Sequence, residues 1–253
     1  MKTCVRVHDV VIGEGIPKII VPIVGHTESA LLEQAALIKD SPADAVEWRA
    51  DWFEGLAEET HLLHVLYALR TAIGNLPLLF TIRTKSEGGQ FEGQMEAYRN
   101  SNLAAAKSGL ADLIDVEFGR GGDTLVHHIR ELRASNVKVV VSSHTFTHTP
   151  PQEELLHRLR AMQQAGADIV KIAVMPNTPR DVIALLSASE EFTQNHAGTP
   201  VISISMGALG AISRIAGMVS GTAMTFGTVG AASAPGQLPA KTLAELLQAL
   251  HSS

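Results

Sequence analysis

Short apolar runs that recur about every 30 residues constrain the fold of this 253-residue chain more than any other feature. Each run is rich in Val, Ile, Leu or Phe and ends near turn-forming residues, which is typical of buried β-strands. The eight runs are "KIIVPIVG", "DAVEWRA", "PLLFTIRT", "DLIDVEF", "VKVVVSSH", "DIVKIAVM", "PVISISMG" and "TAMTFG". Such runs favour parallel strands that are covered on both faces.

Segments with helical periodicity separate these runs, for example residues 28–39, 124–135, 152–166 and 180–192. Residues 238–250 supply a last helix. Eight strand-then-helix units in a chain of this length predict an α/β fold with a single domain, residues 1–253, closed into a (β/α)8 TIM barrel. Ahead of the first unit, "CVRVHDVVIGEG" predicts an N-terminal β-hairpin that closes the bottom of the barrel.

Composition excludes several classes of protein. The 20 Lys and Arg are outnumbered by 26 Asp and Glu, and no basic run is present, so we expect no nucleic-acid partner. One cysteine, Cys4, allows no intramolecular disulfide and fits a reducing, cytoplasmic setting. Charged residues such as Arg6, Asp9 and Glu14 interrupt the N-terminal apolar patches, so we expect neither a signal peptide nor membrane insertion.

Polar side chains gather where barrel enzymes carry their chemistry, at the C-terminal ends of the strands. Glu47 and Arg49 lie two residues apart and therefore on one face of their strand. The full set is Glu47, Arg49, Arg83, Glu87, His144, Lys171, Arg214, Ser233 and Gln237. Two acids, three arginines, a histidine and a lysine are costly to bring together without a ligand that satisfies them. We therefore expect a small-molecule site at this end of the barrel.

Lys171 is the most unusual member of this set, because it lies inside "DIVKIAV", a run that otherwise resembles a buried strand. An edge strand would let the lysine reach water, but a closed barrel has no edge. A structural ion pair with Asp115 or Glu117 is a second explanation. The third is that Lys171 acts in catalysis. His144, on the preceding strand, favours the third explanation, although a lone histidine is more often a hydrogen-bonded core residue.

Other members of the set have plain structural explanations as well. Glu47 and Arg49 could form only a buried ion pair with each other, and Arg214 could lie on an exposed helix face. The glycine-rich stretch "TFGTVGAASAPGQ" resembles a phosphate cradle, which in isolation is a weak signal. His144 and His148 have the spacing of a helical zinc motif, but two prolines follow at once, so we expect no metal site.

Taken together, these segments make the chain similar to the type I 3-dehydroquinate dehydratases over nearly its whole length. The similarity is carried by "VIGEGIPKIIVPIVG", "EWRADWF", "LLFTIRTKSEGG", "LIDVEF", "VVVSSHTF", "ADIVKIAVMP", "SISMG", "ISRIAG", "TFG" and "ASAPGQ". The resemblance implies a (β/α)8 barrel that is usually a homodimer and needs neither metal nor dissociable cofactor. It also implies conversion of 3-dehydroquinate to 3-dehydroshikimate in the shikimate pathway of aromatic amino acid biosynthesis.

The resemblance further implies roles for individual residues, which agree with the chemistry. Lys171 would form an imine that draws off the charge of a carbanion next to the carbonyl. We expect burial among Ile169, Ile172 and Val174 to favour its neutral amine. His144 would remove the C2 proton and later protonate the departing hydroxyl on the same face, a syn elimination, while Glu87 holds its ring.

The remaining residues of the set would bind substrate. Glu47, Arg49 and Arg83 would hold ring hydroxyls. Arg214, Ser233 and Gln237 would bind the carboxylate, for which a guanidinium has the matching geometry.

The chain departs from the family pattern at Pro22, where a serine is frequent, and at Ser143 and Thr145 on either side of His144. Two other functions therefore stay open. A class I aldolase also uses a Schiff-base lysine on this fold, and a catalytically inactive barrel could simply bind a small acid. The sequence also leaves open whether an active enzyme serves biosynthesis or quinate breakdown.

Overall fold

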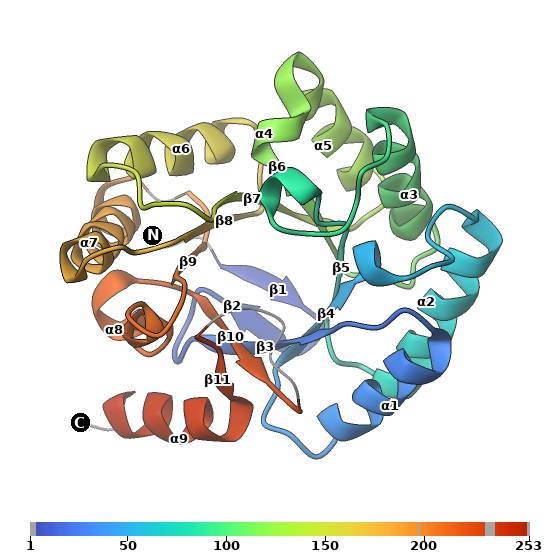
Figure 1. Cartoon of the computed structure of the whole chain (residues 1–253), viewed down its shortest axis with the longest axis horizontal. Coiled ribbons are helices and arrows are strands. Elements are labelled where there is room, and N and C mark those ends of the chain that lie inside the picture. Colours follow the sequence, from blue (N-terminus) through green and yellow to red (C-terminus); the bar gives the residue numbers. More distant parts are fainter. Residues whose placement is uncertain (1–3, 197, 231–235, 252–253) are drawn as a thin grey trace.

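A parallel sheet curled into a barrel forms the centre of the computed structural model, which describes residues 4–196, 198–230 and 236–251 (Figure 1). Each strand from β3 to β8 pairs in parallel with the next, and β10 pairs with both β3 and β11. The strands are β3 (Lys18–Ile23), β4 (Ala45–Arg49), β5 (Leu78–Thr81), β6 (Leu113–Glu117), β7 (Lys138–Thr145), β8 (Ile169–Val174), β9 (Val201–Ser205), β10 (Met224–Thr228) and β11 (Leu238–Pro239).

The seam of the barrel lies between β9 and β10. In the described residues these strands join through a bridge between Val201 and Thr222 and through a 2.7 Å hydrogen bond from Ala223 N to Val201 O. The predicted TIM-barrel architecture is confirmed. It differs from a fully closed barrel because the sheet remains nearly open at this seam.

Helices surround the sheet on its outer face (Figure 1). The longer ones are α1 (Glu28–Ile38), α2 (Glu59–Ile73), α3 (Met95–Lys107), α5 (Leu125–Arg133), α6 (Gln152–Gln164), α7 (Pro179–Asn195) and α9 (Ala240–His251). Shorter turns are η1 (Ala50–Trp52), η2 (Lys85–Glu87), α4 (Phe118–Gly121), η3 (Gly122–Thr124), η4 (Ala211–Arg214) and α8 (Gly217–Ser220). Across the described part of the chain, no helix has both the length and the apolar character needed to cross a membrane.

Local sequence fixes where several helices begin. Thr27 caps α1 by accepting a hydrogen bond from Ala30 N. At α7, Thr178 and Asp181 form a reciprocal capping box, and Pro179 occupies the first turn, where its missing N–H costs nothing. These helices then bury residues such as Leu31 and Leu185 against the outer face of the sheet.

Alternation along the strands decides which side chains enter the barrel. In β8, Ile169 and Ala173 belong to the inner apolar cluster, whereas Ile172 and Val174 pack in the outer cluster beneath the helices. Lys171 therefore points inward between Ile169 and Ala173. The prediction that Ile172 and Val174 surround the lysine is wrong, because side chains one and three positions away point to the opposite face.

An antiparallel hairpin of β1 (Val5–Val7) and β2 (Val10–Ile12) precedes the barrel. Its Val5, Val7 and Ile12 join the inner cluster together with Leu79, Leu113 and Ile169 near the starts of their strands. In Figure 1 the hairpin lies across the centre of the ring of strands. It closes the barrel bottom, as predicted, and leaves the C-terminal ends of the strands as the accessible mouth.

Candidate active site

A cavity of about 180 Å³ lies at the C-terminal ends of the strands. Every predicted site residue that the structure describes lines it: Glu47, Arg49, Arg83, Glu87, His144, Lys171, Arg214 and Gln237. Ser233 lies outside the described residues. The volume is below the usual range for drug-sized ligands, so the cavity suits one small metabolite.

Lys171 is only 4% exposed and is not tightly paired. Its Nζ lies 3.5 Å from Glu47 Oε1, at the long limit of a hydrogen bond, and 4.0 Å from Asp115 Oδ2. The same atom lies 4.3 Å from the centroid of the Phe226 ring, which forms an apolar floor with a favourable π face. A lysine held this loosely keeps its amine available for a ligand in the cavity.

His144 is oriented by Glu87. Glu87 Oε2 lies 2.8 Å from His144 Nδ1 and also accepts the backbone N–H of His144 at 3.0 Å. Burial, together with the positive charges of Arg83, Lys171 and Arg49, holds the pKa of His144 well below its ordinary value. The imidazole is therefore neutral at physiological pH, and Nε2 is the ring nitrogen that has no contact with Glu87.

The pKa of the Glu87 carboxyl is shifted upward, which favours the uncharged form of this group as well. Burial raises the pKa of Glu87 to about 8; Arg83 opposes this shift, while Glu117 and Asp115 add to it. Both members of the pair thus resist charge in this buried position. The pair is suited to pass one proton without creating a permanent buried charge.

Phe146 covers the histidine at the cavity mouth. Its ring stacks on the His144 imidazole with a centroid separation of 6.4 Å and an interplanar angle of 22°. Gly88 permits this approach, because a Cβ at that position would lie 2.4 Å from the Phe146 ring and the backbone has a φ of 79°. Sequence reasoning missed Phe146, although it lies two residues after His144 and therefore on the same side of the chain.

Arg83 is the centre of a buried ionic network. Its Nη1 donates to Glu117 Oε1 and to Ser142 Oγ, both at 3.0 Å, and its Nη2 donates to Asp115 Oδ1 at 2.8 Å. Burial opposes the charge of Arg83, but Asp115, Glu117 and Glu87 together raise its pKa above the ordinary value. Glu117 is thus engaged by Arg83, whereas the described acids within 4.0 Å of Lys171 Nζ are Glu47 and Asp115.

Glu47 and Arg49 do not form the mutual ion pair that was the structural alternative. Arg49 instead makes a two-pronged contact with Asp51, with Nε–Oδ1 and Nη2–Oδ2 distances of 2.8 Å each. Glu47 accepts a 3.0 Å hydrogen bond from Thr81 Oγ1. Both side chains nevertheless reach the cavity, as their two-residue spacing on one strand face predicts.

Arg214 belongs to η4 and is 2% exposed, so the exposed-face alternative is wrong. Its Nε donates to Gly236 O at 2.7 Å and its Nη1 donates to Phe226 O at 3.2 Å. Burial lowers the pKa of Arg214 to about 10, which still leaves the guanidinium charged at neutral pH. Both of these contacts are with neutral carbonyl oxygens, and the charged guanidinium is suited to an anionic ligand group.

The three departures from the family pattern have clear places in the structure. Pro22 is buried and pairs in register with Glu47, and the pairing of β3 with β10 ends earlier, at Ile20. Thr145 Oγ1 accepts a 3.1 Å hydrogen bond from Arg158, and Ser143 is buried. Neither Ser143 nor Thr145 contributes to the 2.8 Å contact of His144 with Glu87.

Metal binding finds no support in side-chain geometry. Within the described ranges, no three His, Cys, Asp or Glu side chains are arranged to hold an ion. Of the two histidines with zinc-like spacing, His144 is bonded to Glu87, while His148 contacts Thr147.

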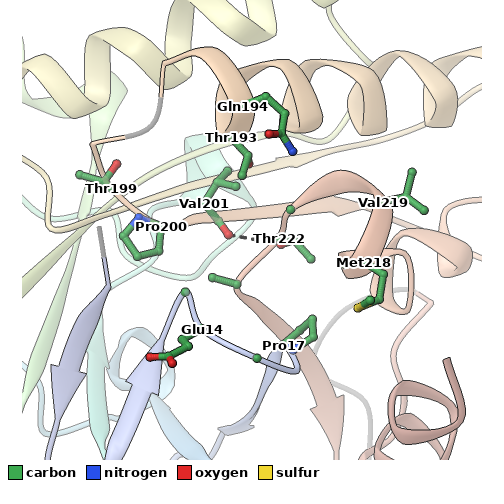
Figure 2. Close-up of a pocket in the computed structure, with 15 residues that line it drawn as sticks. Glu14, Pro17, Thr193, Gln194, Thr199, Pro200, Val201, Met218, Val219 and Thr222 are labelled. Carbon is green, nitrogen blue, oxygen red and sulfur yellow. Dashed lines mark hydrogen bonds between the residues drawn. The ribbon is translucent and has the colours of Figure 1, made fainter. Parts of the chain in front are cut away.

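A second pocket, of about 210 Å³, lies at the opposite end of the barrel (Figure 2). It is bounded by Glu14 and Pro17 ahead of β3, by the end of α7, and by the seam where Thr222 Oγ1 donates to Val201 O at 3.4 Å. Glu14 is the one charged residue among the described residues that line it. The pocket lacks the converging acids and bases of the mouth, which makes the mouth the candidate active site.

Comparison with known proteins gives concordant results. The family model described as Type I 3-dehydroquinase matches residues 19–253. The 3-dehydroquinate dehydratase of Clostridium kluyveri is 45% identical over 253 residues, which span 100% of this chain and 99% of that protein. A crystal structure of type I 3-dehydroquinate dehydratase from Clostridium difficile with covalent modified comenic acid has a TM-score of 0.97 and 42% identity, and the match covers 100% and 99% of the two chains. The 3-dehydroquinate dehydratase of Geobacillus kaustophilus gives a TM-score of 0.96 at 37% identity, with the same coverage.

Proposed function

This chain belongs to the type I 3-dehydroquinase family and has its activity, that of a 3-dehydroquinate dehydratase, a hydro-lyase of the shikimate pathway; on that premise we propose that Lys171 carries the reaction as a Schiff base. The observation that supports this most strongly is the position of Lys171 Nζ in the cavity, loosely held between Glu47 and the Phe226 ring. The covalently modified ligand named for the Clostridium difficile relative is consistent with covalent chemistry in this cavity.

The imine would supply what the elimination needs. Loss of water from a β-hydroxy ketone passes through a carbanion next to the carbonyl, and a protonated imine stabilises this charge far better than a ketone. Lys171 Nζ would attack the carbonyl carbon, and the carbonyl oxygen would leave as water. Hydrolysis of the imine would release 3-dehydroshikimate at the end of the reaction.

His144 would perform both proton transfers. Its neutral imidazole would accept the C2 proton at Nε2, and the resulting imidazolium would return a proton to the departing hydroxyl. Glu87 would fix the ring through Nδ1, at 2.8 Å. Because one histidine serves both steps, the proton and the hydroxyl would leave from the same face, which corresponds to a syn elimination.

The other cavity residues would hold the substrate in position. Arg214 would bind the carboxylate, with Gln237 from the same wall and Ser233 as a further candidate. Glu47 and Arg49 would hold ring hydroxyls. Arg83 is committed to Asp115, Glu117 and Ser142, so we propose that it acts on a hydroxyl only through the edge of its guanidinium that borders the cavity.

The two rival functions fit the cavity less well. A class I aldolase with a phosphorylated substrate would need a strong phosphate site, whereas Arg214 suits a single carboxylate. An inactive binding barrel would not require the Glu87–His144 pair to be kept beside a loosely held lysine. The experiment is to compare turnover of 3-dehydroquinate by the wild type and by Lys171→Ala, with thermal unfolding as a check of folding. A folded Lys171→Ala variant that still eliminates water at the wild-type rate would refute the proposal.

We further propose that the protein is a cytoplasmic homodimer, as the family resemblance and the single cysteine Cys4 suggest. Light scattering coupled to size-exclusion chromatography tests the dimer directly. A mass that corresponds to the 26.9 kDa chain alone would contradict it.

A further inference from the structure

Asp115 is a buried acid beneath the reactive lysine that the elimination chemistry leaves without a task. It lies on the inner face of β6, has no exposed surface, and is absent from the residues that line the cavity. Its Oδ1 accepts hydrogen bonds from Arg83 Nη2 at 2.8 Å and from Ser142 Oγ at 2.7 Å. Its Oδ2 has no hydrogen-bond partner among the described residues and lies 4.0 Å from Lys171 Nζ.

A buried carboxylate oxygen without a hydrogen-bond donor is unfavourable, because it loses its hydrogen bonds to water and the charge of Lys171 at 4.0 Å replaces them only in part. The neighbouring acid Glu117 shows the usual solution, since both of its oxygens accept hydrogen bonds from Arg83 or Thr84. Asp115 could rotate toward a donor only by breaking its two contacts through Oδ1. The network therefore holds Oδ2 toward Lys171, a position that has a cost in the resting protein.

Formation of the imine changes what Lys171 requires of its surroundings. An ammonium group and a ketone give a protonated imine and water, so the positive charge stays on Nζ while three N–H bonds become one. That one N–H bond needs a single acceptor in a fixed direction. Glu47 is one candidate, but it lines the cavity, accepts from Thr81 and is in reach of a substrate hydroxyl. Asp115 lies outside the cavity and stays available throughout the reaction.

We propose that Asp115 is a positioning residue that acts through Lys171: its Oδ2 accepts the N–H of the protonated imine and keeps the imine in its charged, electron-withdrawing form. This inference rests on the proposed Schiff-base role of Lys171. Ser142 and Arg83 both donate hydrogen bonds to Asp115 Oδ1 and so fix the plane of its carboxylate. The resting separation of 4.0 Å closes when Nζ becomes planar and its single N–H turns toward Asp115.

Charged and titratable groups face Lys171 from several strands, and they determine the expected effect of pH. Glu47 from β4 and Asp115 from β6 have oxygens within 4.0 Å of Lys171 Nζ. The other charged or titratable groups that line the same cavity are Arg49, Arg83, Glu87, His144 and Arg214. Removal of the negative charge of Asp115 leaves Arg83 and Arg49 less balanced around the imine nitrogen. The imine then loses its proton at lower pH, since an opposite charge within about 4 to 6 Å shifts a titration by roughly 1 to 3 units.

The test uses Asp115→Asn, which keeps the size of the side chain. We expect kcat to fall about 10-fold or more while KM changes less than about 3-fold, and the alkaline limb of the kcat profile to move down by about 1 pH unit. Borohydride trapping of the 3-dehydroquinate adduct should slow in parallel at high pH. Ser142→Ala is the matched control, because it removes a contact to Oδ1 but keeps the charge, so its alkaline limb should stay at the wild-type position.

Thermal unfolding shows whether each variant is folded, and Asp115→Ser replaces Asp115→Asn if the latter does not fold. A folded Asp115 variant with the wild-type alkaline limb and trapping rate would overturn the inference. The wild-type reaction separates this outcome from a wider failure. If the wild type turns over 3-dehydroquinate but gives no adduct at Lys171, the Schiff-base proposal itself is wrong.

Discussion

The Nδ1 atom of His144 and the Oε2 atom of Glu87 lie 2.8 Å apart, and the same oxygen accepts the backbone N–H of His144. This double contact fixes the ring in one orientation relative to its own backbone. The histidine consequently presents one nitrogen to the cavity, and its neutral form is favoured by burial and by the surrounding cations. This geometry supports the proposed role of His144 as the proton carrier beside Lys171.

His144→Ala should leave the imine able to form but slow the elimination by about 10²-fold to 10⁴-fold, the usual contribution of a positioned acid or base. Measurement of kcat together with borohydride trapping of the substrate adduct separates the two steps. A variant that is trapped at the wild-type level but turns over slowly is the expected result. An unchanged kcat would assign the proton transfers to another group.

Glu87→Gln should change how stability depends on pH. Burial raises the pKa of Glu87 to about 8, so the folded state holds this proton more tightly than the unfolded state, whose pKa is near 4.5. The resulting stabilisation is complete below about pH 4.5 and is lost as the pH rises through about 8. Glutamine does not titrate, so the variant's free energy of unfolding should rise relative to wild type from pH 5 to 8. Denaturant unfolding at several pH values checks this; a constant difference would contradict it.

Arg214→Ala should chiefly weaken substrate binding. A charge-assisted hydrogen bond contributes roughly 1.5 to 3 kcal/mol, so we expect KM to rise about 10-fold to 100-fold. Arg214→Lys keeps the charge but loses the contacts of Nε with Gly236 O and of Nη1 with Phe226 O, and it should give an intermediate KM. Steady-state kinetics on both variants provides the measurement. If KM is the same in all three proteins, Arg214 does not bind the carboxylate.

Chelators should leave activity intact, because a protonated imine replaces a Lewis acid as the electron sink. The measurement is kcat/KM before and after prolonged dialysis against EDTA. Loss of activity that added zinc restores would contradict a mechanism carried by Lys171 and His144 alone.

Much of the architecture was predictable because it depends on local patterns. Period-two spacing places Glu47 and Arg49 on one strand face, and parallel strands bring their C-terminal ends to one mouth, so the cavity lining could be predicted before the structure. The same rule places Ile172 and Val174 on the outer face, against the prediction that they surround Lys171, because only residues two apart in a strand share a face.

The contacts across the barrel were harder to predict, because they join residues that are far apart in sequence. The Phe226 ring under Lys171 and the contact of Arg83 with Asp115 depend on barrel curvature and on side-chain rotamers. The sequence suggests Asp115 and Glu117 as partners of Lys171, whereas Arg83 engages both. A pattern of acids at alternate positions of a buried strand, as in "LIDVEF", was the available signal for such a network.

The most direct test of the central claim is reduction of the Lys171 adduct. Protein is incubated with 3-dehydroquinate, reduced with borohydride and analysed by mass spectrometry, with Lys171→Ala as the matched control. The account predicts that the wild type gains the mass of one reduced ligand on the peptide containing "DIVKIAV", and that the variant gains none. Labelling at another lysine, or no labelling in protein that turns over 3-dehydroquinate, would contradict the role assigned to Lys171.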